Sequence, residues 1–211
     1  NKEKQAAAFT CFVDPGRRVY VRRINIGGNV KTRVEVVRRE MRQMEGGYLS
    51  NSAVERSKQR LQRLPYIEKV EVETNPVSGT PDLVDVVFDI KEGLPGQFSG
   101  GLGYSESQSF LLNGSFVHSN FMGTGNRVAA EINAGQYSKV FSLSHTDPYT
   151  TIDGVSRTVS ATWRRIDQYT SSSSDFQTET GTLAVDYGWP ITEFQSLRMG
   201  LAVQRSDLFT D

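Results

Sequence analysis

The chain has 211 residues, of which 37% are hydrophobic, and its 24 Lys and Arg residues balance its 24 Asp and Glu residues. This length suits one large domain or two small ones. The zero net charge provides no general attraction to polyanions, so we expect no nucleic-acid partner. The single cysteine, Cys11, excludes an internal disulfide, and no apolar run approaches the roughly 20 residues of a membrane-spanning helix.

The composition of the chain changes near Gly93. Before this residue, charged residues are dense and apolar residues recur with helical spacing, whereas after it Gly, Ser, Thr and Asn increase and apolar and polar residues alternate. Helical spacing and strict alternation are typical of different architectures. We therefore expect a mixed domain over residues 17–92 and an all-strand part over residues 93–211.

The mixed domain is predicted to begin with a strand over residues 17–26, which ends at the turn formers of residues 27–29. A first helix is predicted over residues 33–44, because Thr32 and Glu35 have the spacing of a capping box. The apolar residues that would share the buried face of this helix are Val34, Val37, Met41 and Met44.

A second helix is predicted between Ser50 or Asn51, either of which can cap its N-terminus, and Pro65, which ends it. Two alternating strands follow, and the turn formers of residues 75–82 predict that they pair as a hairpin. The order of elements is that of an α+β domain: strand, helix, helix, strand, strand. Its expected apolar positions are Val54, Leu61, Leu64, Val70, Val72, Val84, Val86, Phe88 and Ile90.

From Gln97 onward, about seven successive segments alternate apolar and polar residues, and each is close to the ten residues of a tilted membrane-spanning strand. Turns rich in Gly, Asn, Asp or Ser separate these segments, so the pattern predicts an antiparallel up-and-down meander. One face is expected to hold Phe98, Leu102, Val128, Ile132, Leu183, Val185, Leu197 and Leu201. The opposite face is expected to hold Arg127, Glu131, Asp186 and Arg198.

Alternation alone does not distinguish a soluble barrel or sandwich, whose apolar face points inward, from a membrane barrel, whose apolar face contacts lipid. Two features favour the membrane barrel, while the soluble fold stays open. Several charged residues lie on the opposite face, and aromatic residues gather toward segment ends, as in an interfacial girdle. These aromatic residues are Tyr104, Phe121, Tyr149, Trp163, Tyr169, Tyr187 and Trp189.

No constellation of residues points to catalysis. The two histidines, His118 and His145, fall in different strands and lack further ligands at metal-binding spacing, so we expect no metal site. The glycines of residues 100–103 match no nucleotide-binding motif, because no helix follows them. Asp147 lies close to a histidine, but no motif supplies an activated Ser or Cys. We expect no catalytic residue, no cofactor and no enzyme activity.

Several motifs, in matching order, resemble the BamA family, whose members are the central subunits of outer-membrane barrel-assembly machines. The first domain resembles the last polypeptide-transport-associated (POTRA) domain of that family, and the second part resembles its early barrel strands. The motifs are residues 19–24 (VYVRRI), 28–29 (GN), 38–46 (RREMRQMEG), 81–86 (PDLVDV), 120–125 (NFMGTG), 146–149 (TDPY) and 152–156 (IDGVS).

The resemblance implies a domain plan. Residues 1–16 would be the C-terminal strand remnant of a preceding POTRA domain, residues 17–92 a POTRA domain in the periplasm, and residues 93–211 the N-terminal part of a transmembrane barrel in the bacterial outer membrane. Only about the first seven strands of the barrel would be present. The partners it implies are accessory lipoproteins, unfolded outer-membrane protein clients and outer-membrane lipid.

Two groups of residues are candidates for these roles. The resemblance implies that the charged residues of the first helix dock an accessory lipoprotein, although such a run is also typical of a solvated helix face. The first barrel strand is a candidate client-pairing edge, because its glycines leave few side chains to pack; the alternative is an ordinary closing strand. The docking candidates are Arg38, Arg39, Glu40 and Arg42, and the edge candidates are Phe98, Ser99, Gly100, Gly101, Leu102, Gly103 and Tyr104.

Three functions are compatible with these expectations. The first is an assembly factor that folds and inserts β-barrel proteins into the outer membrane. The second is a sister POTRA-barrel transporter that exports a polypeptide across that membrane. The third is a soluble periplasmic binding protein with a β-sandwich.

Overall fold

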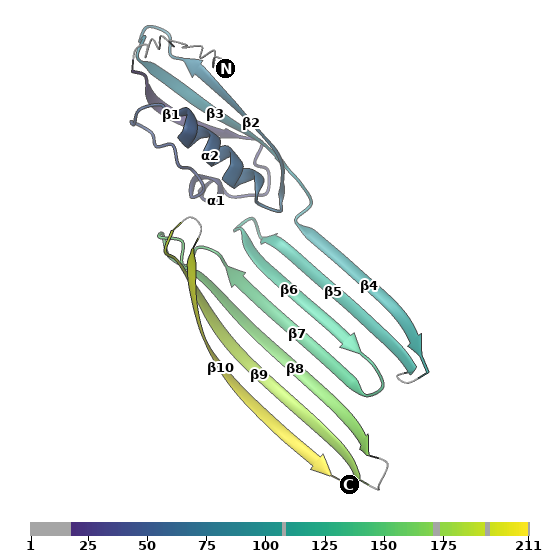
Figure 1. The fold of residues 1–211 in the computed structure, drawn as a ribbon. Helices are drawn as coiled ribbons and strands as arrows, with labels where there is room; N and C mark the ends of the chain where they lie inside the picture. Colours follow the sequence, from purple (N-terminus) through teal and green to yellow (C-terminus); the bar gives the residue numbers. More distant parts are fainter. Residues whose placement is uncertain (1–17, 107–108, 171–173, 193–194, 211) are drawn as a thin grey trace, which may run out of the picture.

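The computed structural model describes residues 18–106, 109–170, 174–192 and 195–210, and Figure 1 shows that they form two parts. The first part is a three-stranded sheet with helices packed against it, and the second is a long sheet of seven strands. The sequence change at Gly93 therefore coincides with the boundary between the two sheets.

The first part has the predicted order of strand, helix, helix, strand and strand. Strand β3 is central, with β1 parallel to it on one side and β2 antiparallel on the other through the predicted hairpin. All of the buried hydrophobic residues in the described chain lie between Val21 and Ile90, so this part holds the core. The elements are β1 (Tyr20–Gly27), α1 (Val34–Arg38), α2 (Asn51–Gln62), β2 (Ile67–Pro76) and β3 (Leu83–Glu92).

The prediction that the first helix runs to residue 44 is wrong, because α1 ends at Arg38. The backbone N–H groups of Arg42 and Gln43 donate to the hydroxyl of Ser57, at 2.8 and 3.3 Å, instead of to helical carbonyl groups. Ser57 is fully buried in α2. Hydrogen bonds to the buried hydroxyl of the second helix therefore take the place of the helical hydrogen bonds that the last turns of the first helix would have made.

The start of α1 also differs from the prediction. The capping box is wrong, because the N-cap residue is Arg33 and no side chain caps it, while Thr32 is buried and bonds elsewhere. Of the residues predicted for the buried face, Val34 and Met44 are exposed, whereas Val36 is buried. The first helix is thus little more than one turn long, and its buried residues are Val36 and Val37.

The second helix is confirmed. Ser50 is its N-cap residue and accepts a hydrogen bond from the backbone N–H of Ala53 at 3.4 Å. The helix ends at Gln62, shortly before Pro65, which cannot continue a helical hydrogen-bond ladder. Leu61 is fully buried against the sheet.

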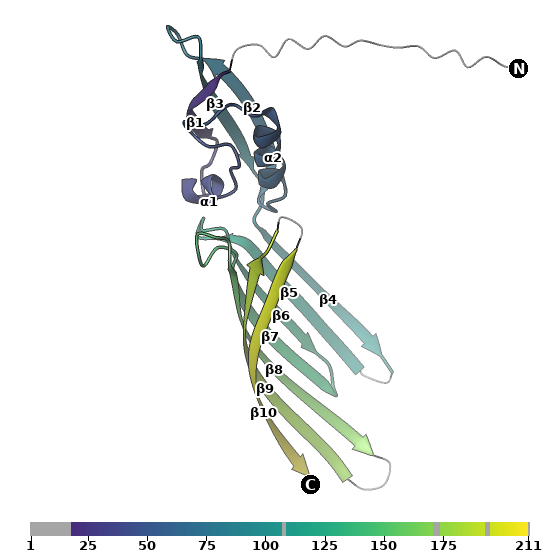
Figure 2. The ribbon, with the colours of Figure 1, turned by 60° about the vertical axis from the view of Figure 1, so that its left-hand side comes forward.

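The second part is the predicted meander, in which each strand pairs antiparallel with its neighbour in sequence. Strands β4 and β10 lie at its edges, and each has one neighbour among the described residues, so the described sheet is curved but not closed (Figures 1 and 2). The strands are β4 (Gly96–Ser105), β5 (Ser109–Phe121), β6 (Asn126–Ala134), β7 (Ser138–Asp147), β8 (Ser156–Thr170), β9 (Ser174–Pro190) and β10 (Ser196–Thr210).

The register of the seven strands confirms the predicted division into two faces. Phe98 pairs with Phe116, which pairs with Ala130, so apolar side chains line up from strand to strand on one face. On the other face, Arg127 lies in the same row as Asp186. No second layer covers the apolar face in the described chain, and its side chains are largely exposed.

The remaining expectations concern particular residues. His118 and His145 lie on the apolar face in the same row, on either side of Val128, and the described residues contain no cluster of three or more metal-ligating side chains. Among the residues described, none of the helices is long and apolar enough to cross a membrane. Residues 1–16, including Cys11, lie outside the described part of the chain, as does the side chain of Tyr169.

Candidate functional site

Strand β4, which contains the candidate pairing edge, is hydrogen-bonded to β5 and to no other described strand. Gly100 lies directly opposite Gly114 of β5 on the apolar face. With no side chain at either position, the face has a shallow hollow of about 560 Å³ between Phe98, Leu102 and their neighbours. The edge strand therefore exposes its backbone on this face at Gly100, between the side chains of Phe98 and Leu102.

The glycines of β4 are not equivalent. A Cβ atom at Gly101 would lie 2.5 Å from the Asn113 side-chain oxygen, so a larger residue there would require Asn113 to move. At Gly103 the nearest atom, in Leu111, would be 3.7 Å away, which is an ordinary contact. A side chain at Gly101 would therefore displace Asn113, whereas the contacts at Gly103 leave room for one.

The four charged residues of the first-helix region do not share one exposed face. Arg38 is exposed and lies 3.4 Å from the Glu45 carboxylate, and Arg42 is partly exposed. Glu40 is buried, with a side chain that is 7% exposed. The premise of an exposed charge at Glu40 is therefore wrong, because the chain leaves the helix after Arg38 and turns this side chain inward.

Glu40 has partners within the chain. Its carboxylate accepts two hydrogen bonds from the guanidinium of Arg60 in α2, at 2.7 and 3.0 Å. Burial alone would lower the pKa of Arg60, but the charge of Glu40 and its hydrogen bond outweigh burial and raise it. The ion pair is therefore a structural element of this domain, whatever else Glu40 contacts.

Tyr149, which the sequence predicts in an aromatic girdle, lies instead at the junction between the two parts. It follows β7, at the end of the long sheet nearest α1 and α2 (Figure 2). Its hydroxyl accepts a hydrogen bond from Arg60 at 3.1 Å, and the Arg39 guanidinium stacks 4.3 Å from its ring centre. The sequence carries no periodic signal for such a contact, because its partners are about 90 or more residues away.

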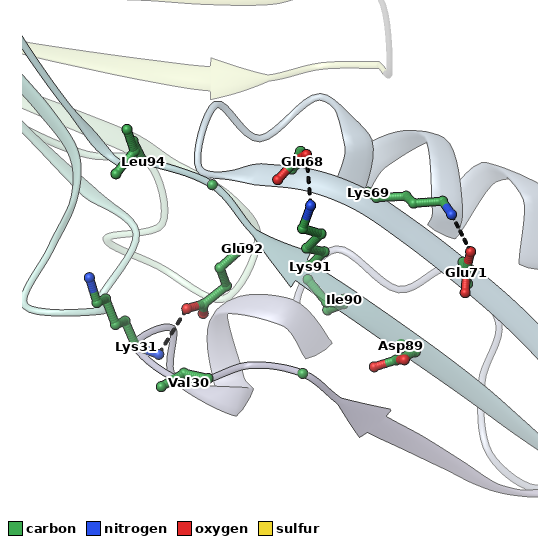
Figure 3. A pocket seen from close by; sticks show the side chains of 12 residues that line it. Val30, Lys31, Glu68, Lys69, Glu71, Asp89, Ile90, Lys91, Glu92 and Leu94 are labelled. Atoms are coloured by element: carbon green, nitrogen blue, oxygen red, sulfur yellow. Dashed lines mark hydrogen bonds and ion pairs between the residues drawn. The ribbon is translucent and has the colours of Figure 1, made fainter.

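A groove of about 760 Å³ lies at the end of the small sheet beside the linker to β4 (Figure 3). Several of its charged side chains pair with one another, including Lys91 with Glu68 and Lys69 with Glu71. The Glu92 carboxylate accepts hydrogen bonds from the backbone of neighbouring residues. Because these charged groups already have partners within the chain, we interpret the groove as solvated surface and assign no ligand to it.

Comparison with known families agrees with both parts of the structure. Residues 19–93 match the POTRA model, described as "Surface antigen variable number repeat". Residues 120–211 match the "Omp85 superfamily domain". The chain contains a POTRA domain followed by an Omp85 superfamily domain.

Two named proteins are similar to the chain over nearly its whole length. The "Outer membrane protein assembly factor BamA" of Neisseria meningitidis is 34% identical over 97% of the chain. The protein of the same name from Nitratidesulfovibrio vulgaris is 28% identical over 98% of the chain. The chain covers 26% and 25% of these relatives, so it spans about a quarter of their length.

Solved structures show the same relationship. The crystal structure of BamA from Haemophilus ducreyi lacking POTRA domains 1–3 is 35% identical, with a TM-score of 0.79 over 93% of the chain and 37% of that structure. CdiB from Acinetobacter baumannii has a TM-score of 0.65 over 92% of the chain and 39% of that structure, but is 10% identical. This second likeness is one of fold alone.

Proposed function

We propose that the protein is an outer-membrane assembly factor, which folds and inserts β-barrel proteins into the bacterial outer membrane. The single observation that supports this most strongly is an uncovered apolar sheet that ends in a glycine-rich edge strand. Residues 93–211 would be the N-terminal part of its barrel, and residues 17–92 a POTRA domain in the periplasm. The alternative is a transporter that exports a polypeptide, and no observation beyond a similar fold supports it.

Membrane insertion follows from the apolar face. Leu102 and Leu201, at opposite edges of the sheet, are each 84% exposed in the chain. A patch of this extent is unfavourable in water and favourable in lipid. Lipid in turn cannot satisfy backbone N–H and C=O groups, so a free strand edge there attracts another strand.

The pairing edge would use backbone chemistry. An incoming client strand would add to the outer edge of β4 by β-augmentation, and Phe98 to Tyr104 would provide its hydrogen-bonding groups. Gly100, Gly101 and Gly103 would keep the seam weak, because glycine packs few atoms and loses more conformational entropy on ordering. We propose no catalytic step: the free energy of the client's own folding and hydrogen bonding would drive insertion.

A proline scan from Ser99 to Gly103 tests the edge. In an antiparallel pair, N–H groups alternate between the partner strand and the other side. Proline at an outward N–H should slow client assembly into liposomes and leave the melting of the sheet unchanged, whereas proline at an N–H that bonds to β5 should lower its stability. Wild-type assembly rates in every outward-facing variant would exclude the edge mechanism.

The docking of an accessory lipoprotein is a separate proposal. Since Glu40 and Arg39 lie at the junction, Arg38 and Arg42 are the members of the group that reach the surface. Charge reversal in Arg42→Glu should reduce the amount of accessory lipoprotein that co-purifies, because like charges would then meet at the interface. Arg23→Glu, on the exposed side of β1, is the matched control. Equal co-purification from both variants would argue that these charges are simply solvated.

A further inference from the structure

The two parts of the chain are joined by more than their linker. Two turns of the long sheet, between β5 and β6 and between β7 and β8, contact the segment around α1 and α2. Domains joined only by a linker usually move relative to each other. The contacts at this junction are polar, specific and partly buried, which is unusual for incidental packing.

Tyr149 is the central residue of the contact from the second turn. Its hydroxyl accepts a hydrogen bond from Arg60 at 3.1 Å, and this guanidinium is the one that pairs with the buried Glu40 carboxylate. The Arg39 guanidinium also lies over its ring, 4.3 Å from the ring centre, where the negative face of the ring attracts the cation. Burial and the charge of Glu40 both raise the pKa of Tyr149. One side chain of the long sheet thus contacts two guanidinium groups of the POTRA domain, one of which forms the ion pair with Glu40.

The first turn makes its own bonds to the same domain. The buried Asn120 donates to the Thr32 hydroxyl at 2.8 Å and accepts from the Gly125 N–H at 2.8 Å. The backbone N–H of Arg33 donates to the Gly123 carbonyl at 2.9 Å. The turn is therefore fastened to residues 32 and 33 by both side chain and backbone.

The segment that receives this turn is itself fixed. The Glu92 carboxylate, at the end of β3, accepts the N–H groups of Lys31 and Thr32 at 2.9 and 2.7 Å, and Figure 3 shows it directed toward Lys31. Residues 31–33 thus lie between the last residue of the POTRA sheet and the first turn of the long sheet. Movement of one part would break bonds to the other.

Glycine geometry shows how closely the surfaces meet. Gly125 has a φ of +74°, and a Cβ atom there would lie 2.4 Å from the Arg39 guanidinium and 3.1 Å from the Tyr66 hydroxyl. Burial raises the pKa of Tyr66 to about 12. There is no space at this point for even a methyl group.

We propose that Tyr149, with Arg39 and the Glu40–Arg60 ion pair, forms a lock that fixes the angle between the POTRA domain and the barrel sheet. The turn of residues 120–126 provides a second fastening beside it. Tyr149 is a positioning residue in this role. The lock sets the direction in which the POTRA domain approaches the end of the sheet where β4 begins.

The lock also connects the two candidate sites, a step that rests on the proposed function. A protein docked at Arg38 and Arg42 would lie next to Arg39 and Glu40, which are parts of the lock. Docking there would therefore change the strength of the lock and the angle of the POTRA domain. The test of the lock uses the protein without accessory subunits or clients, so its outcome is separate from that of the proposed function.

The test measures the distance between spin labels at Glu55 and Ser138 in the intact protein in lipid bilayers, with Cys11 replaced by Ser. Both positions are exposed, one on α2 and the other at the far end of β7. The wild-type distance distribution should be narrow. Tyr149→Phe, which keeps the ring and removes the hydroxyl, should broaden it, and Tyr149→Leu should broaden it further. Ile152→Ala, in the same turn but 97% exposed, should leave it unchanged.

A narrow distribution in Tyr149→Leu, with native fluorescence from Trp163 and Trp189 in the sheet, overturns the proposal. A glycine pair provides a second test should that variant fail to fold. Gly125→Ala and Gly46→Ala impose the same backbone strain, at φ of +74° and +76°, but nothing lies within 4 Å of a Cβ atom at Gly46. Gly125→Ala should broaden or shift the distribution, and Gly46→Ala should not. Equal effects of the two variants overturn the lock.

Discussion

The POTRA domain and the barrel sheet are built from the same alternation of apolar and polar residues, and they use it in opposite ways. In β3 of the POTRA domain, Val86 and Phe88 are fully buried in the core of the domain. In β10, Leu201 and Val203 remain exposed because nothing in the described chain covers them. Alternation therefore determines which side chains share a face, and the neighbouring layer determines whether that face meets protein or lipid.

The comparison predicts where a core mutation is most costly. Phe88→Ala removes a fully buried side chain from the central strand and should destabilise the POTRA domain by about 3–5 kcal/mol. Hydrogen exchange of the intact protein should show the loss in residues 20–92. The matched change Leu201→Ala should have a much smaller effect, because that side chain has no protein layer to leave empty. Equal losses of stability in Phe88→Ala and Leu201→Ala would contradict the claim that only the POTRA domain buries its apolar side chains against protein.

A charge on the apolar face gives the next largest expected effect. Leu183→Arg should destabilise the sheet in bilayers by about 2–4 kcal/mol, the cost of arginine near the bilayer midplane. Thr182→Arg, the adjacent residue on the opposite face of β9, is the control and should be tolerated. Tryptophan fluorescence during guanidinium unfolding measures both. A larger loss of stability in Thr182→Arg than in Leu183→Arg would indicate that lipid contacts the opposite face of the sheet.

The buried hydroxyl of Ser57 sharpens the comparison within the POTRA domain. Ser57→Ala removes the acceptor for two backbone N–H groups, at Arg42 and Gln43, and should cost about 1–3 kcal/mol. Faster hydrogen exchange at residues 39–44 should accompany the loss, with the long sheet unaffected. Unchanged exchange there would show that the hydroxyl does not hold this segment.

The smallest expected effect depends on pH. Burial alone would raise the pKa of Glu92, but the hydrogen bonds from Thr32 and Lys31 outweigh burial and lower it. Because the folded pKa lies below the unfolded one, this stabilisation is present above the unfolded pKa and is lost as pH falls through the folded pKa. Glu92→Gln should therefore reduce the unfolding midpoint of the POTRA domain near pH 7, and the difference should vanish in acid. A difference that is independent of pH would contradict this account.

Much of the fold could be predicted from the sequence because it depends on local patterns. The order of elements along the chain, the hairpin over residues 75–82 and the two faces of the meander follow from periodicity and turn chemistry. The N-cap at Ser50 could be predicted for the same reason. The end of α1 was not, because it depends on the hydroxyl of Ser57, which lies in a different helix.

The candidate sites divide in the same way. The edge strand could be placed because β4 is continuous in sequence and its glycines are visible there. The inward turn of Glu40 could not, because it depends on Arg60, which is 20 positions away in the second helix. The position of Tyr149 could not either, because its contact with Arg60 spans 89 positions. The charge run around Glu40 predicted an exposed side chain, and the structure buries it.

The central claim is that the uncovered face of the meander contacts lipid. It is tested most directly by the accessibility of spin labels at Glu131 and Ile132, neighbouring residues of β6 on opposite faces. In bilayers, the label at 132 should collide more with membrane-soluble oxygen, and the label at 131 more with a water-soluble nickel chelate. Greater chelate access at 132 than at 131 would contradict the account and favour a soluble sheet whose apolar face meets another layer of protein.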